Sequence, residues 1–600
     1  MNRTEALSGR SWRVMPRRMF LRMFPLTLIS TVTWALADIA DALAVGNQVG
    51  ETGLAVIGLT TPVYLLYDML GIGFASGGGI MHTRLTAAER RDQALAHSRF
   101  LSCVLLGIGF LIAALGNLFL EPLLTGIGAG EEFPVLRAMC AGYLRPLISA
   151  APLFFLNHLL YYFVRSDDHP GLASAGFSIG CILDLGLNIL LVIILKKGVQ
   201  GSILATIAAQ AASAAIMGVH LFSSRKGILR LKALVKARAD KKSVRASART
   251  SIRTGFSSAM SYFFQFLFLL LGNHLLIAAG GRGRIDGELA VAVFDLVMNC
   301  SFITASIYQG SGETMQPLAA TFAVEHDKQS RKYTLKLAVC AGLLPGMLLN
   351  GVLALLAGPI AGLFGLTDTA GQAMAVPALR VFLLSTIPAG LMMIFIAYAQ
   401  SIDQLRSAAI GTFLRNAVFQ LAFTLILGLF LPEDFWWVFF LTEGLSLLVM
   451  LLVHYWFVRR RQAKEVPVIS CTMTNGDHEL GKVMAQLEQF CAAHEIPEGT
   501  AVQLQLAVEE LCAVTMRQAF TGEPDEYIRI TLAIEEGPRY LLHIRNSAPY
   551  FNPLDMKMER VRKDMESEIM DSIGVMMIRE KASSISFRNY QGYNVVTVEY

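Results

Sequence analysis

The sequence has few charged residues, and its cysteines form none of the common ligand patterns. Asp, Glu, Lys and Arg make up 16% of the 600 residues, against about 25% in a typical soluble domain. The eight cysteines include no C-x-x-C pair, so neither a zinc site nor a disulfide framework is predicted. The net charge of +5 is too small to indicate nucleic acid as a partner. Much of the chain is therefore expected to contact membrane lipid.

Long apolar runs are present instead. A membrane-spanning helix needs about 20 apolar residues, and the mean hydropathy of the chain is +0.50. We expect twelve spans, at 24–46, 52–82, 99–122, 136–163, 171–195 and 199–223, and at 255–280, 288–318, 334–358, 373–400, 408–431 and 436–458. No small-residue cleavage site follows the first run, so we expect it to be a retained span and not a signal peptide.

Lys and Arg gather in alternate loops. They occur in the N-terminus and after helices two, four, six, eight and twelve. Positive charge in short loops marks the cytoplasmic side, so the sequence predicts a multi-pass protein of the cell membrane with both termini in the cytoplasm. The expected parts are a basic cytoplasmic N-terminus (1–23), a first six-helix bundle (24–223), a basic cytoplasmic linker (224–254), a second bundle (255–458), a short linker (459–467) and a cytoplasmic domain (468–600).

The two halves of the membrane part resemble each other. The segment YFVRSDDHPGLASA is similar to YAQSIDQLRSAA, which aligns Asp168 with Asp403 at an offset of about 235 residues. A similar offset aligns the glycine-rich GIGFASGGG with IYQGSGETMQP. Repeats of six helices are a recurrent plan of transporters, with sites at or near the interface between the repeats.

Acidic residues inside the apolar runs need an explanation, because a carboxylate at the bilayer centre costs at least about 2.5 kcal/mol. Asp38 and Asp41 lie in the first run and Asp184 in the fifth. Such groups could face a water-filled cavity or cap a kink. Alternatively, they could exchange a proton or bind Na⁺, since burial and a second carboxylate raise a carboxyl pKa. The residues alone leave these alternatives open.

Four stretches resemble the patterns of the MATE multidrug efflux transporters over about residues 15–460. They are DALAVGNQVGETGLAVIGLTTPV, SDDHPGLASAGFSIGCILDLGLN, GVQGSILATIAAQ and IYQGSGETMQPLAATF. The resemblance implies the MOP-superfamily fold, in which two six-helix bundles form a V. It also implies H⁺- or Na⁺-coupled export of amphipathic organic cations.

The same resemblance implies a cation-coupling site in the first bundle. Asp41 and Asp184 match acidic residues of that site, and Thr206 lies in a matching segment. Asp38 is interpreted as a residue that assists this site or lines the wall of the cavity. Gly180 stands where the family often has Asn, which removes one ligand and weakens the case for Na⁺ more than that for a proton.

Other polar residues of the spans are expected to be structural. Asp295, Glu313 and Glu443 are interpreted as solvated or as making interhelical hydrogen bonds, and not as coupling groups. The histidines expected to be isolated and structural are His158, His220 and His274.

The segment after Arg461 has the pattern of a soluble α/β domain. Two amphipathic helices precede the alternating strands YIRITLAIEEG and RYLLHIRNSAP, and SISFRNYQGYNVVTVEY predicts a final hairpin. The motifs LQLAVEELCAVTMRQAF, LLHIRNSAPYFNP and SIGVMMIREKASS resemble the GHKL ATP-binding fold, and most of all the anti-sigma-factor serine kinases.

The nucleotide site that this second resemblance implies is incomplete. Glu510 matches the catalytic Glu, and Gly574 remains of the glycine-rich box. Val514 stands at the Mg²⁺-binding Asn, and Asn546 stands at the Asp that binds adenine. The partner glycines are Ala548 and Ser572. We expect a degenerate ATP-binding module with regulatory function, with ATP still open as a weak ligand.

The leading hypothesis is a cation-coupled antiporter for organic compounds with a cytoplasmic regulatory domain. It assigns no catalytic residue and no bound metal. Its partners would be lipid, small organic cations and a cytoplasmic regulatory protein. Two alternatives are a flippase for lipid-linked precursors and a membrane sensor whose GHKL domain acts on a sigma-factor-type regulator. Retained kinase residues would favour the sensor, and Val514 argues against it.

Overall fold

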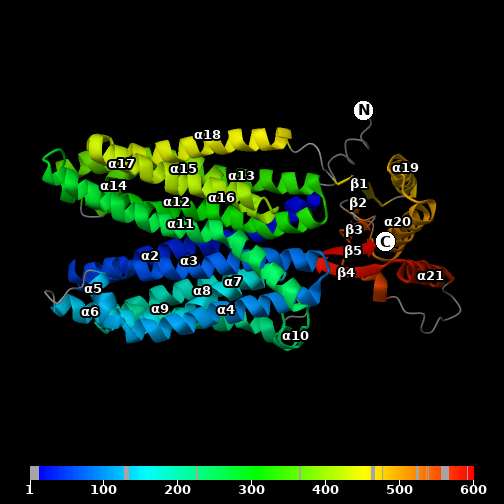
Figure 1. Ribbon diagram of the computed structural model, residues 1–600, viewed down its shortest axis with the longest axis horizontal. Helices are drawn as coiled ribbons and strands as arrows, with labels where there is room; N and C mark the ends of the chain where they lie inside the picture. Colours follow the sequence, from blue (N-terminus) through cyan, green and yellow to red (C-terminus); the bar gives the residue numbers. More distant parts are fainter. Residues whose placement is uncertain are drawn as a thin grey trace.

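The protein consists of an elongated helical part and a smaller α/β domain at one end of it (Figure 1). The structure is a computed structural model. It describes residues 13–49, 51–127, 134–223, 228–363, 366–460, 466–475, 477–521, 526–535, 537, 539–555, 566–590 and 592–600.

Two helical bundles lie side by side in the elongated part (Figure 1). The first contains α2 (Val14–Val49), α3 (Glu51–Ala87), α4 (Arg91–Leu118), α5 (Leu120–Gly126), α6 (Pro134–Ser149), α7 (Ala151–Ser166), α8 (Pro170–Asn188), the π-helical η1 (Ile189–Ile194) and α9 (Gly198–Ser223). A short helix α10 (Leu231–Lys236) lies in the linker. The second contains α11 (Lys241–Gly281), α12 (Gly287–Val324), α13 (Lys328–Leu355), α14 (Ala357–Leu363), α15 (Thr369–Ser401), α16 (Leu405–Phe413), the π-helical η2 (Leu414–Phe419), α17 (Gln420–Phe430), η3 (Pro432–Asp434) and α18 (Trp437–Arg460).

Ten of the described helices are long and apolar enough to cross a membrane. The number becomes eleven if α6 and α7, which meet at a bend of 50°, form one span. The bend follows from Pro152 near the start of α7, because proline has no N–H to continue the hydrogen bonds of α6. The last expected run lies in α18, where the apolar stretch covers only Trp437–Val453 among the described residues. The protein therefore crosses the membrane many times, but the described helices that are long and apolar enough number ten or eleven and not the twelve expected.

The two bundles are related by an internal repeat. Asp168 and Asp403, which the sequence alignment pairs, both have a positive φ, of 71° and 64°. Glu89 and His326 form a second such pair, with φ of 57° and 56°. Non-glycine residues rarely adopt this conformation, so its recurrence at matching turns supports the alignment.

The glycine-rich motifs form the contact between the bundles. Gly77 of α3 and Gly255 of α11 lie where any side chain would overlap the backbone of the opposite helix. In the second half, a Cβ on Gly310 of α12 would lie 2.9 Å from Thr31 Oγ1 of α2. Each motif therefore packs its helix against the first helix of the other bundle, which is how small residues act in membrane helix packing.

We expect Gly255→Ala to destabilise the protein, because its methyl group would overlap the carbonyl of Gly73 and force α3 and α11 apart. Gly107→Ala is the matched control, since nothing lies within 4 Å of a Cβ there. An alanine in an open helical position is favoured over glycine by about 0.5–1 kcal/mol. Thermal unfolding in detergent should show a lower melting temperature for Gly255→Ala than for the wild-type protein. The melting temperature of the control should not decrease. Equal melting temperatures would contradict close packing.

The C-terminal domain is a five-stranded antiparallel sheet with the order β1-β2-β3-β5-β4. Its elements are β1 (Val468–Thr474), α19 (Asp477–Ala493), α20 (Glu498–Gln518), β2 (Tyr527–Glu535), β3 (Arg539–Asn546), η4 (Pro553–Asp555), α21 (Glu566–Lys581), β4 (Ser584–Tyr590) and β5 (Tyr593–Glu599). The predicted helices, the two strands and the final hairpin are confirmed. Strand β1 was not predicted, because its seven residues become a strand by pairing with β2.

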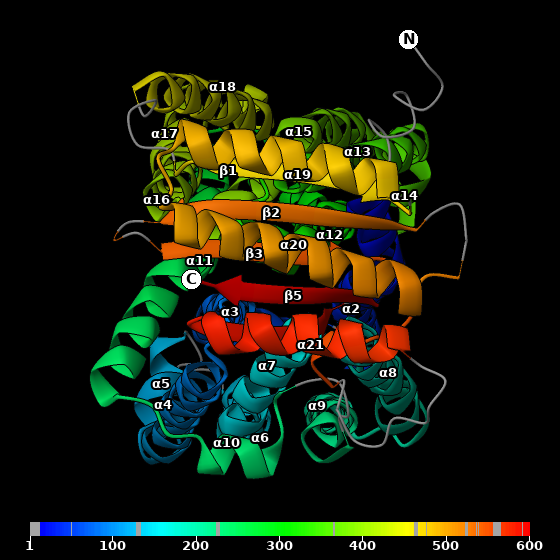
Figure 2. The same ribbon diagram turned by 90° about the vertical axis from the view of Figure 1, so that its right-hand side faces the viewer.

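The two faces of the sheet have different neighbours. Helices α19, α20 and α21 cover one face, and the other face lies against the ends of the membrane helices (Figure 2). Side chains alternate between the faces along a strand. Ile528, Ile530 and Leu532 of β2 join the core under the helices. Arg529 and Thr531 lie on the face toward the membrane part and are nevertheless buried.

Candidate functional site

A buried ion pair joins the two bundles. Arg165, at the end of α7, donates from Nη1 to Glu313 Oε2 of α12 at 2.5 Å. The two side chains are 3% and 8% exposed. Charges in an apolar interior are costly unless they are paired and hydrogen-bonded. This pair can exist only while the bundles are in contact.

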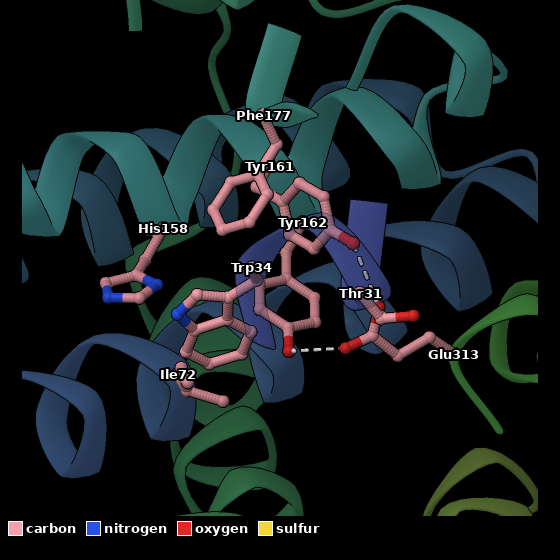
Figure 3. A pocket seen from close by; sticks show the side chains of 8 residues that line it. All are labelled: Thr31, Trp34, Ile72, His158, Tyr161, Tyr162, Phe177 and Glu313. Carbon is pink, nitrogen blue, oxygen red and sulfur yellow. Dashed lines mark hydrogen bonds between the residues drawn. The ribbon is translucent and has the colours of Figure 1, made fainter. Parts of the chain in front are cut away.

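Three further polar side chains complete the hydrogen bonds of Glu313. Tyr161 donates to Oε2 at 3.0 Å and Gln309 to Oε1 at 3.0 Å, while Tyr162 OH lies 3.5 Å from Oε1. Arg165 hydrogen-bonds Tyr161 OH and lies 4.2 Å over the tyrosine ring. Figure 3 shows both tyrosine hydroxyls directed at the carboxylate.

A small pocket beside this carboxylate is lined mainly by rings (Figure 3). Its lining residues are Thr31 and Trp34 of α2, Ile72 of α3, His158, Tyr161 and Tyr162 of α7, Phe177 of α8, and Glu313. Phe177 packs against Trp34 and Tyr161, with ring centroids 6.0 and 4.9 Å apart. Aromatic faces and a carboxylate both attract positive charge, so this lining favours a positively charged group over a negative one.

The sequence did not predict this site. Glu313 was expected to be solvated or to make an interhelical hydrogen bond. It makes such a bond, but its partner Arg165 in the other bundle was not predicted. His158 was expected to be isolated, yet its Nε2 lies 3.4 Å from Asp68 Oδ1 of α3. A usable signal was present, since Asp68 is an acid within the apolar run 52–82.

The cation site predicted in the first bundle is described in part. Asp184 of α8 is buried, and Thr206 of α9 lies beside it, with its hydroxyl donating to the backbone carbonyl of Ser202 at 3.2 Å. Asn188 donates from Nδ2 to Asp184 Oδ1 at 3.3 Å. The structure therefore brings Asp184 and Thr206 together and adds Asn188. Asp38 and Asp41 belong to α2, but their side chains lie outside the described part of the chain.

The position of Gly180 explains one difference from the MATE pattern that the sequence resembles. A Cβ there would lie 2.7 Å from Ser213 Cβ, so no asparagine fits while α8 and α9 stay this close. Asn188, one turn after Asp184 and not one turn before it, supplies an amide at the same carboxylate.

The two other second-bundle acids singled out in the sequence have partners within their own bundle. Glu443 of α18 accepts from Arg415 Nε at 2.7 Å, and both belong to that bundle. Asp295 accepts from Asn299, four residues on in α12, at 3.1 Å and is exposed. Glu313 is different because its cation belongs to the first bundle.

His220, expected to be isolated, contributes to an anchor for the linker. Its Nε2 lies 2.8 Å from Asp167 Oδ2, and His82 Nε2 lies 3.4 Å from Oδ1. The backbone N–H groups of Ile228 and Leu229 donate to the same carboxylate at 3.0 and 2.8 Å. Burial alone would raise the pKa of Asp167, but these hydrogen bonds hold it well below its usual value. The carboxylate therefore stays charged and ties the linker to the first bundle.

The described residues of the C-terminal domain do not fit Mg²⁺-ATP. Gly574 lies inside helix α21, where a Cβ would overlap the Glu510 carboxylate, and so offers no open loop for phosphates. Asn546 Oδ1 already accepts from Ala548 N at 3.2 Å and from Asn594 Nδ2 at 3.0 Å. Val514 is buried in the core beneath the sheet. The side chain of Ser572 lies outside the described part of the chain.

We expect the full-length protein to show neither Mg²⁺-dependent ATP binding nor ATP hydrolysis. A divalent cation beside phosphates needs oxygen ligands, and Val514 supplies none. Calorimetry with ATP and Mg²⁺, run beside a phosphate-release assay, measures both properties. Tight Mg²⁺-dependent binding with phosphate release would contradict this reading.

Two family models match the chain. MatE matches residues 27–190, and the histidine kinase-like ATPase domain matches residues 474–600. The chain is similar to a FAD transporter of Shewanella oneidensis, 26% identical over 355 residues that cover 58% of this chain and 74% of that protein. It is also similar to the multidrug export protein MepA of Staphylococcus saprophyticus, 22% identical over 402 residues, or 67% of this chain and 85% of that protein.

Solved structures show the same fold for the membrane part. A MOP superfamily transporter from Pyrococcus furiosus has a TM-score of 0.67 at 19% identity, covering 76% of this chain and 99% of that one. An outward-facing multidrug resistance MATE transporter has a TM-score of 0.66 at 20% identity, covering 74% and 96%. The chain therefore contains a MatE domain at residues 27–190 and a histidine kinase-like ATPase domain at residues 474–600, and its membrane part has the fold of these solved transporters.

Proposed function

We propose that this chain is a cation-coupled exporter of amphipathic organic compounds that works by separating and rejoining its two bundles. The observation that supports this is the buried pair of Arg165 and Glu313, which crosses between the bundles. Separating the bundles must break the pair. Neutralising the carboxylate by a proton, or replacing Arg165 by another cation, would lower the cost of that step.

The coupling ion, H⁺ or Na⁺, is proposed to bind at Asp184 together with Thr206 and Asn188. Asp41 and Asp38 of α2 complete the proposed site. Carboxylate and amide oxygens suit both a proton and a hard cation. Binding or release of an ion there changes the charge of the protein interior. That change would accompany the switch of the cavity opening from one side of the membrane to the other.

The proposed cargo is a planar aromatic cation held by the pocket beside Glu313. Trp34 and Phe177 offer ring faces, and Glu313 offers its negative charge once the bundles separate and Arg165 leaves it. One relative is named as a FAD transporter and another as a multidrug export protein, and planar aromatic groups are common to many such compounds. A lipid-linked precursor would need a long basic stripe, whereas Arg165 is the only Lys or Arg lining the two described pockets.

Export by reconstituted protein tests the cargo. We expect proteoliposomes to transport a fluorescent planar cation in preference to FAD. Trp34→Ala should reduce its transport at least fivefold, because a stacking face is lost. Phe110→Ala is the control, since this exposed α4 side chain lies away from the pocket. Preferred transport of FAD, or equal loss in both variants, would contradict the assignment.

A further inference from the structure

The C-terminal sheet buries a polar face against the membrane part. Arg529, Thr531, His543 and Arg545 all lie on this face and are each at most 4% exposed. Burying so many polar groups is costly unless they find partners. Thr531 and His543 pair within the sheet, with Ser470 at 3.3 Å and Thr597 at 3.1 Å. Arg529 and Arg545 pair instead with a turn of the membrane part, and the edge strand β4 contacts a second turn.

The first turn joins α12 and α13 of the second bundle. Asp327 accepts from Arg529 Nε at 2.7 Å and from Nη2 at 2.8 Å, a two-point contact that is directional and strong. Glu325 pairs with Arg545, which also lies over the ring of Phe322. Burial alone would raise the pKa of Asp327, but Arg529 holds it below its usual value, so the pair stays charged.

The second turn joins α3 and α4 of the first bundle. Arg91 donates from Nη2 to the backbone carbonyl of Phe587 in β4 at 2.7 Å. Glu89 pairs with Arg91 at 3.2 Å and lies close to Ser586 and Arg588. Strand β4 is at one edge of the sheet, and β2 is next to the other edge. The sheet therefore extends across the ends of both bundles, as Figure 2 shows.

These two turns are equivalent in the internal repeat. Glu89 and His326 are the matching positive-φ residues of the two turns, and the sheet contacts both, since His326 Nε2 lies 3.1 Å from Glu535 Oε1. A third contact, from Arg84 of α3 to Asp403 at 2.9 Å, joins the bundles directly at this end. A part that contacts both equivalent turns fixes the distance between the bundles.

We propose that the membrane-facing side of the sheet is a clasp that holds the two bundles together, and that transport requires it to release one of the two turns. This inference rests on the proposed function, because the bundles of an exporter must separate at this end to admit cargo. The partner of the clasp is the chain's own pair of repeat-related turns. The C-terminal domain would then control transport through contact and not through ATP hydrolysis.

A labelling experiment tests the clasp without measuring transport. Ser76→Cys places a thiol in the pocket between the bundles that Arg165 and Glu313 line. The eight native cysteines are replaced by alanine. Maleimide is added to membrane vesicles on the side that carries the C-terminal domain. Removing one contact, with Asp327→Asn and Arg529→Gln together, should raise the labelling rate at least fivefold.

The control for this experiment removes one acidic and one basic charge at another place in the C-terminal domain. Glu479→Gln with Lys482→Gln breaks a pair on α19, which lies on the face of the sheet away from the membrane part. This control should label at the rate of the parent protein. Equal labelling in the parent, the clasp variant and the control would overturn the proposal, whether or not the protein transports.

A tethering experiment then links the clasp to transport. Glu89→Cys with Ser586→Cys ties the domain to the first bundle, and His326→Cys with Glu535→Cys ties it to the second. A short, reducible thiol cross-linker joins each pair. We expect either tether alone to leave export above half of the untreated rate. Both tethers together should abolish it, and reduction should restore it.

The two hypotheses fail in different ways. Export that continues with both tethers in place would overturn the clasp and leave the exporter intact. A parent protein that exports nothing before cross-linking would count against the proposed function, and the labelling rates would still decide the clasp.

Discussion

Replacing Glu313 by Gln should abolish export and lower the thermal stability of the protein. The change leaves Arg165 as a buried cation whose remaining partners are neutral. Removing one partner of a buried ion pair costs about 3–5 kcal/mol. Export should be lost because the charge that must be neutralised when the bundles separate is absent in every state. Transport in proteoliposomes and unfolding in detergent measure the two effects separately.

Glu443→Gln is the matched control. It breaks the ion pair with Arg415, which lies within the second bundle. Stability should fall in the same direction, but export should persist, because this pair need not break when the bundles move. The double variant Arg165→Gln with Glu313→Gln should recover much of the stability without recovering export. Export at the wild-type rate in that double variant would remove the inter-bundle pair from the mechanism.

Asp184→Asn should uncouple transport from the ion gradient. The amide is nearly the size of the carboxylate, so packing is retained while the charge is lost. The carboxylate is buried beside Thr206 and Asn188, and an uncharged group there can neither take up a proton nor balance Na⁺. We expect gradient-driven export to fall at least tenfold with folding unchanged.

Asp295→Asn provides a control with the same local geometry. Asp295 also accepts from an asparagine four residues further along its helix, but it is exposed. Export by this variant should stay within twofold of wild type. If Asp184→Asn also exports normally under a gradient, the coupling site lies elsewhere.

Features set by local patterns were predictable from the sequence. Apolar runs placed the membrane helices, since length and composition are enough to identify a span. Alternation placed β2 and β3 and the final hairpin. Strand β1 was not predicted because its pairing with β2 is non-local. The bend between α6 and α7 was not predicted either, although Pro152 lies at it.

The candidate site was less predictable for a physical reason. Arg165 and Glu313 are 148 residues apart in the chain, and no periodicity reports a contact between different bundles. Asp184 and Thr206 were found because a family resemblance placed them side by side. The clasp was also not predictable, because its contacts join residues that are far apart in the sequence. Arg529 looks like an ordinary outward residue of a strand until the membrane part covers that face.

The transport claim is tested most directly by the flux of a planar organic cation through the wild-type protein, reconstituted alone with the membrane potential clamped. A proton gradient or a Na⁺ gradient is imposed separately, without nucleotide. We expect one of the two gradients to drive accumulation of the cation, and collapse of that gradient by an ionophore to stop it. Flux that ignores both gradients, or that appears only when ATP and Mg²⁺ are supplied, would contradict the transport claim.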